Sequence, residues 1–60
     1  MTPRETRELI MRALARGPLY IGVLPLIVGA TPAQVDAAVR ELARQKLVTR
    51  NVAGTVERWP

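Results

Sequence analysis

The sequence predicts a mainly α-helical domain with a small C-terminal β-hairpin. Three observations lead to this prediction: two threonine–proline pairs that mark helix starts, apolar residues at helical spacing after each pair, and two β-prone runs around a glycine near the C-terminus. A chain of 60 residues buries too little surface to form a second core. We therefore expect one domain over residues 1–60 that contains three helices and one hairpin.

The first helix is predicted over residues 3–16. Thr2 supplies a capping hydroxyl, Pro3 suits the first helical position, and Glu5 stands where a capping box needs a carboxylate. Apolar residues follow at helical spacing, namely Leu9, Ile10, Ala13 and Leu14. A glycine–proline pair then ends the helix.

The second helix is predicted over residues 22–29. It is preceded by a short β-prone run at 18–21, which we expect to form an extended piece or a one-bridge strand. Pro25 falls in the first turn of the helix, where its missing N–H costs little. Gly29 suits the end of the helix because glycine tolerates the left-handed conformation.

The third helix is predicted over residues 32–46, and its start is the clearest boundary in the sequence. Thr31, Pro32 and Gln34 repeat the pattern of capping threonine, first-turn proline and capping-box side chain. Apolar residues then fall on one face of the helix, namely Val35, Val39 and Leu42.

The last element is predicted to be a hairpin over residues 47–59, because two β-prone runs flank a glycine. A two-residue loop would place Val48 opposite Trp59 and Arg50 opposite Glu57, an apolar pair and an ion pair. A three-residue loop, with the glycine in a bulge, would shift every pair by one residue. The sequence is compatible with either loop length. Trp59 is expected to cover the core because of its large apolar area.

Composition excludes several classes of function. The chain has no cysteine, histidine or serine, so it offers no disulfide, no usual zinc ligands and no serine or cysteine nucleophile. We therefore expect neither enzyme activity, nor a cofactor, nor a metal. No stretch reads as a membrane span or signal segment, which favours a cytoplasmic protein.

The charge balance favours an anionic partner. The formal net charge is +4, and all of the basic residues except Lys46 are arginine. Arginine presents planar donors that suit phosphates and the edges of bases. Nucleic acid is therefore an expected partner.

The order of helix, extended piece, helix, tight turn, helix and hairpin resembles the winged helix-turn-helix superfamily of small prokaryotic and phage transcription regulators. The resemblance rests on residues 22–29 for helix 2, 30–32 for the turn, and 35–47 for helix 3 and its exit. It implies that helix 3 is a recognition helix that enters the major groove of double-stranded DNA. It also implies that the hairpin is a wing on the flanking backbone.

Carried over by position, the resemblance implies a set of DNA-contacting residues. On helix 3 these are Ala33, Gln34, Asp36, Ala37, Arg40 and Arg44, and on the wing they are Arg50 and Arg58. Two alanines and an aspartate read bases poorly, so we expect modest or partly shape-based specificity. Arg40 has an alternative role as a local ion-pair partner of Asp36. The two wing arginines have an alternative role in protecting an exposed strand edge.

Helix 2 is unusually apolar. If its core face holds Leu24 and Val28, then Val23, Leu26 and Ile27 point outward at least in part. An exposed apolar patch on a small domain usually marks a partner interface, so we expect a homodimer or another protein partner. The alternative to a DNA-binding transcriptional regulator is therefore a winged-helix protein–protein interaction module that binds DNA weakly or not at all.

Overall fold

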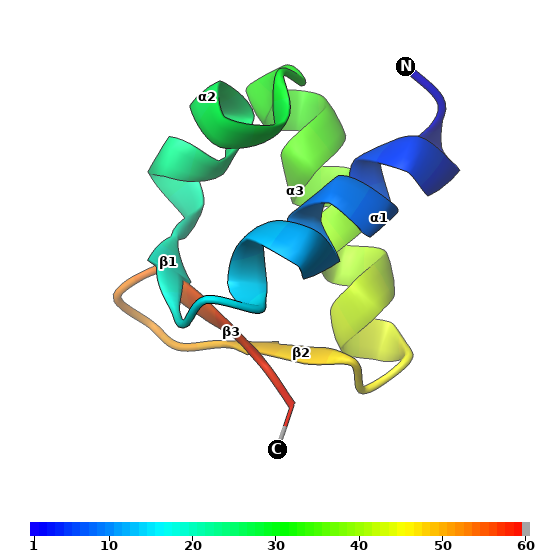
Figure 1. The fold of residues 1–60 in the computed structure, drawn as a ribbon. Coiled ribbons are helices and arrows are strands. Elements are labelled where there is room, and N and C mark those ends of the chain that lie inside the picture. The colour runs from blue at the N-terminus through cyan, green and yellow to red at the C-terminus, as the bar shows by residue number, and fades with distance from the viewer. Residues whose placement is uncertain (60) are drawn as a thin grey trace.

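Helices α1 and α3 pack against each other across the centre of the fold, as the computed structural model shows for residues 1–59 (Figure 1). The elements in chain order are α1 (Pro3–Leu14), β1 (Leu19–Tyr20), the 3₁₀ turn η1 (Ile21–Val23), α2 (Leu24–Val28), α3 (Pro32–Arg44), β2 (Val48–Arg50) and β3 (Thr55–Arg58). The three strands form an antiparallel sheet in the order β1-β3-β2. The fold is therefore mainly helical with a small sheet. The extended piece predicted at 18–21 is strand β1, which pairs with β3 at one edge of that sheet.

Both predicted capping boxes are present, and they fix the starts of α1 and α3. The Thr2 hydroxyl accepts a hydrogen bond of 3.1 Å from the N–H of Glu5, whose carboxylate accepts one of 3.2 Å from the N–H of Thr2. At α3, the hydroxyl of Thr31 accepts from the N–H of Gln34 at 3.1 Å, and the Gln34 side chain accepts from the N–H of Thr31 at 2.9 Å. Each box satisfies N–H groups that the first helical turn leaves without partners.

The helix ends differ from the predicted ones by one or two residues. α1 ends at Leu14 and not at residue 16, because the chain tightens into a turn in which the N–H of Gly17 donates to the carbonyl of Leu14 at 3.0 Å. The helix predicted over 22–29 is divided into η1 and α2. α2 ends at Val28, one residue before the predicted end, and Gly29 caps it in a left-handed conformation with φ of 74°.

α3 ends at Arg44 and not at residue 46, because Lys46 takes a left-handed conformation with φ of 61°. The N–H of Leu47 then donates to the carbonyl of Leu42 at 2.9 Å, and the N–H of Lys46 donates to the carbonyl of Ala43 at 3.0 Å. This bonding is a Schellman motif, in which the left-handed position is usually glycine.

Replacing Lys46 with glycine should raise the free energy of unfolding by about 0.5–1 kcal/mol, because glycine adopts the left-handed conformation without the steric cost of a Cβ atom. Thermal and urea unfolding would measure the change. Lys46→Ala is the matched control, since it removes the same charge and keeps the Cβ atom. Equal effects of the two substitutions would contradict the prediction.

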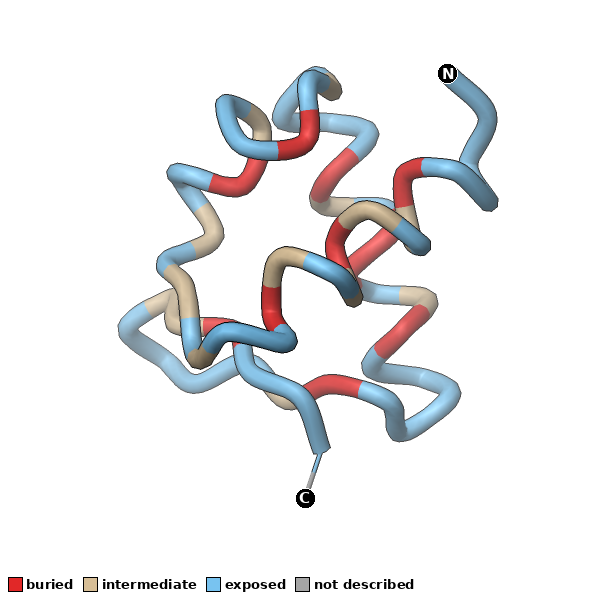
Figure 2. The backbone as a smooth tube through the Cα atoms, in the orientation of Figure 1, coloured by how far each residue is buried: buried red, intermediate tan, exposed pale blue. Residues whose placement is uncertain are grey.

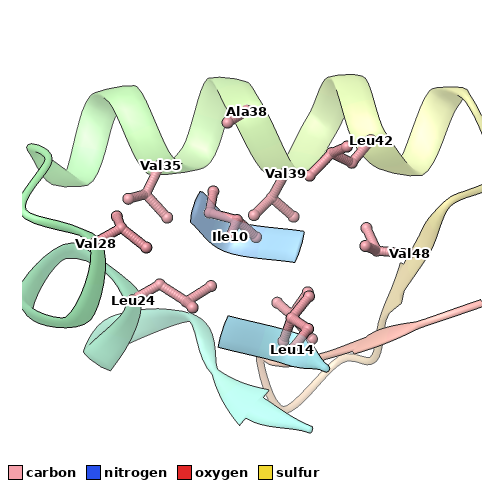
Figure 3. Close-up of a cluster of buried hydrophobic side chains, with 10 residues drawn as sticks. Ile10, Leu14, Leu24, Val28, Val35, Ala38, Val39, Leu42 and Val48 are labelled. Carbon is pink, nitrogen blue, oxygen red and sulfur yellow. The ribbon is translucent and has the colours of Figure 1, made fainter. Parts of the chain in front are cut away.

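The core lies between the inner faces of the helices and the sheet (Figure 2). Its buried side chains are Ile10, Leu14, Leu24, Val28, Val35, Ala38, Val39, Leu42, Val48 and Val56. Ile10 is fully buried and lies beneath α3, close to Val39 (Figure 3). All three predicted core residues of helix 3 are in this set.

The hairpin has the three-residue loop. Val48 pairs with Arg58 and Arg50 pairs with Val56, one residue away from the two-residue-loop register. The N–H of Gly54 donates to the carbonyl of Asn51 at 3.0 Å, and Gly54 is left-handed with φ of 90°. This register turns Val56 into the core and leaves Trp59 53% exposed and outside the set of side chains packed against the core, so the expectation that Trp59 covers the core is wrong.

The tip of the hairpin is anchored to the segment between α1 and α2. The N–H of Ile21 donates to the carbonyl of Gly54 at 2.8 Å. The ring of Tyr20 lies so close to Gly22 and Gly54 that a Cβ atom would approach ring carbons to 2.5 Å at the first glycine and 2.9 Å at the second. A side chain at either position would therefore have to displace the Tyr20 ring.

No single helix within residues 1–59 is long and apolar enough to cross a membrane. The segments Ile21–Val28 and Pro32–Arg44 reach that length and hydropathy only as a pair bent by 111°.

Candidate nucleic-acid interface

α2 and α3 form two helices at a steep angle joined by a tight turn (Figure 1). The chain direction changes by 111° between the Ile21–Val28 and Pro32–Arg44 segments, across residues 29–31. The left-handed Gly29 allows the sharp exit from α2, and the Thr31 capping box starts α3 at once. The angle lies within the range of about 90–120° that is typical of two helices joined by a short turn.

The outer face of α3 is exposed along its whole length. Ala33, Ala37, Arg40 and Arg44 recur at helical spacing on this face, opposite the buried residues. The side chains of Arg40 and Arg44 are each 75% exposed. Gln34 is also exposed, but its side-chain carbonyl caps the helix. These residues were expected to lie on one face of the helix, and they do.

Asp36 joins α3 to the hairpin. Its Oδ2 atom lies 2.8 Å from Nη2 of Arg40 on the same helix, and its Oδ1 atom lies 3.4 Å from Nη1 of Arg50 on β2. The pair with Arg40 is the local alternative that the sequence suggested. The pair with Arg50 was not predicted, because it depends on how the sheet sits against the helix. One carboxylate therefore holds two arginines of the candidate interface side by side.

Arg44 is held by Glu41 in a two-point ion pair. Nη2 of Arg44 lies 2.6 Å from Oε2 of Glu41, and Nε lies 3.1 Å from Oε1. The side chain of Gln45 donates to the same carboxylate at 2.6 Å. The hydrogen bonds from Arg44 and Gln45 lower the pKa of Glu41 below its ordinary value, and the bond to Glu41 raises the pKa of Arg44.

Arg58 does not lie with Arg50, although both belong to the hairpin. The strand register places their side chains on the same face of the sheet as Val48 and Val56, but at opposite ends of the strands. Arg50 reaches Asp36 on α3, whereas Arg58 lines a hollow beside Arg12 of α1. The expected pair of wing arginines is therefore divided between two surfaces.

The outward side chains of the second helical segment are exposed as predicted. Val23 is 38% exposed, Ile27 52% and Leu26 86%, while Leu24 and Val28 are buried. Beside them lies a largely apolar hollow of about 670 Å³, lined by Leu9, Arg12, Ala13, Arg16, Leu19, Ile27 and Val28. The apolar surface thus continues from α2 onto α1, and two arginines border it.

Residues 1–59 contain no cluster of three or more histidine, cysteine, aspartate or glutamate side chains that could hold a metal ion. No family model, curated protein or solved structure matches the chain significantly.

Proposed function

We propose that this chain is a winged helix-turn-helix DNA-binding transcriptional regulator, in which α3 enters the major groove and the hairpin meets the flanking backbone. The observation that carries the proposal is the 111° bend into α3, which leaves one full face of that helix exposed next to the hairpin. The order of elements on which the family resemblance rests is also present. This function is non-enzymatic, needs no cofactor and belongs in the cytoplasm.

In this proposal, the residues of the outer face and the hairpin make different kinds of contact with DNA. Arg40 and Arg44 supply donors for the O6 and N7 atoms of guanine. Ala33 and Ala37 are small enough to let the helix backbone approach the groove floor, but they offer only methyl contacts. Arg50 lies where the hairpin would meet a phosphate. Since few side chains read bases, discrimination between sequences is modest.

Binding of a labelled duplex of random sequence, followed by fluorescence anisotropy over a series of salt concentrations, tests the proposal. A protein that neutralises phosphates releases counterions, so its affinity falls with a log–log slope of about −0.9 for each phosphate contacted. We expect a clear negative slope. Affinity that stays constant as salt rises, or no binding at low salt, would overturn the DNA-binding proposal.

Asp36→Asn should strengthen binding to the random duplex several-fold at low salt. The substitution removes a negative charge that faces the DNA backbone, and it weakens the hold on Arg40 and Arg50, both of which then become available to phosphates. The same anisotropy series measures the gain. Glu8→Gln is the charge-matched control on α1, where Glu8 pairs with Arg4. An equal gain in duplex affinity for both variants would show that affinity depends on net charge alone and not on the position of Asp36.

A second candidate function is a winged-helix protein–protein interaction module, and the exposure of Leu26 favours it. A leucine that is 86% exposed beside a largely apolar hollow is suited to contact with another protein surface. The simplest partner is a second copy of the chain, since dimers with twofold symmetry are the commonest oligomers. A dimer formed in this way leaves the outer face of α3 available to DNA.

Leu26→Glu should shift the chain toward the monomer, because it places a charge in the centre of the apolar patch. Sedimentation velocity over a range of concentrations would measure the shift. Val52→Glu is the matched control, since Val52 is fully exposed at the hairpin tip, away from α2. A wild-type chain that stays monomeric at the highest concentration would exclude self-association through this patch.

A further inference from the structure

The domain has a second hollow, which includes none of the outer-face residues of α3. It has a volume of about 620 Å³ and is formed by α1, the end of α3 and β3. Its charged lining consists of four arginines, Arg4, Arg7, Arg12 and Arg58, and one carboxylate, that of Glu8. Apolar side chains of Met11, Leu42 and Leu47 line it as well. Leu47 is 43% exposed.

The arginines around this hollow are less neutralised than those of α3. Arg4 lies 3.3 Å from Glu8, but Arg7, Arg12 and Arg58 form no ion pair within residues 1–59. On α3, by contrast, Arg40 and Arg44 each have a carboxylate within 2.8 Å. The excess positive charge of the domain is therefore concentrated at the hollow and not at the proposed recognition helix.

We propose that this hollow binds an acidic, amphipathic segment of another protein. Carboxylates on such a segment would meet the guanidinium groups, and its apolar side chains would cover Met11 and Leu47. A DNA backbone would satisfy the charges but would leave the apolar lining against phosphates and sugars. A peptide that carries both kinds of side chain satisfies both features of the hollow. The contact area of one small domain suits a transient complex.

This inference does not depend on DNA binding. The hollow shares no residue with the outer face of α3. Two double variants separate them while changing the net charge equally. Arg12→Gln/Arg58→Gln removes two charges from the hollow, and Arg40→Gln/Arg44→Gln removes two from α3. All four side chains are exposed, so both variants keep the core intact.

The probe is a short fluorescein-labelled helical peptide with glutamate and leucine on one face. Two matched peptides replace the glutamates with glutamine or the leucines with serine. We expect the first peptide to bind the wild-type chain, and each matched peptide to bind about tenfold more weakly. The variant of Arg12 and Arg58 should weaken binding of the first peptide by about tenfold, and the variant of Arg40 and Arg44 should leave it nearly unchanged.

Other results would overturn the inference. Equal losses in the two double variants would mean that the peptide responds only to net charge. Retained binding of the serine peptide would mean that the apolar lining contributes nothing. A loss of duplex DNA binding in the variant of Arg12 and Arg58, without a loss of peptide binding, would assign the hollow to DNA. Circular dichroism of each variant verifies that the fold is unchanged.

Discussion

Replacing Ile10 with alanine should lower the free energy of unfolding by about 2–5 kcal/mol, enough to unfold much of the population at room temperature. Ile10 is fully buried and lies beneath α3, so the substitution leaves a cavity at the contact between the two longest helices. A domain of 60 residues has little stability in reserve, because so much of its surface stays exposed. Urea unfolding followed by circular dichroism would measure the loss.

Ile10→Val is the graded control, because it removes a single methylene and should cost about 0.5–1.5 kcal/mol. Met11→Ala, one residue along the same helix and only partly buried, should cost less than Ile10→Ala. If Ile10→Ala and Met11→Ala were equally destabilising, the packing of α1 on α3 would differ from the one described.

Arg40→Gln should weaken binding to a preferred duplex by about 1–3 kcal/mol. It should also reduce the difference in affinity between that duplex and DNA of random sequence. In the proposed complex, Arg40 projects from the exposed face of α3, the helix assigned to the major groove, and its side chain is 75% exposed. The preferred duplex would come from selection out of a randomised pool. Anisotropy titrations of both duplexes then give the two affinities.

Arg50→Gln is the comparison for Arg40→Gln. A phosphate contact is lost equally on every sequence, so this variant should weaken both duplexes alike and reduce the salt slope by about one. Since Arg40 and Arg50 share Asp36, their effects should not add, and the double variant would measure that coupling. Unchanged affinities in all three variants would favour the protein–protein interaction module.

The starts of the long helices could be predicted because their signals are local. Thr2 and Thr31 cap the N–H groups three residues later, and the sequence alone displays both partners of each box. The outward position of Leu26 could also be predicted, because helical periodicity fixes it once the core face is known. Both predictions depend on residues within one turn of helix.

The end of α3 and the position of Arg58 could not be predicted in the same way. Lys46 takes a left-handed conformation that its side chain does not favour, so no residue type signals the helix end. The loop length around Gly54 decides which strand residues face the core, and a shift of one residue reverses every side chain. That reversal carries Val56 inward and takes Arg58 to the hollow, away from Arg50.

The anchored hairpin tip bears on the thermodynamics of any complex that uses the wing. A loop that is disordered before binding must lose conformational entropy when it docks, and that loss weakens the complex. Here the hydrogen bond from Ile21 to Gly54 and the ring of Tyr20 order the tip before any partner arrives. Docking of the hairpin on any partner would therefore cost little ordering entropy, so less of the contact free energy would be lost to ordering the loop.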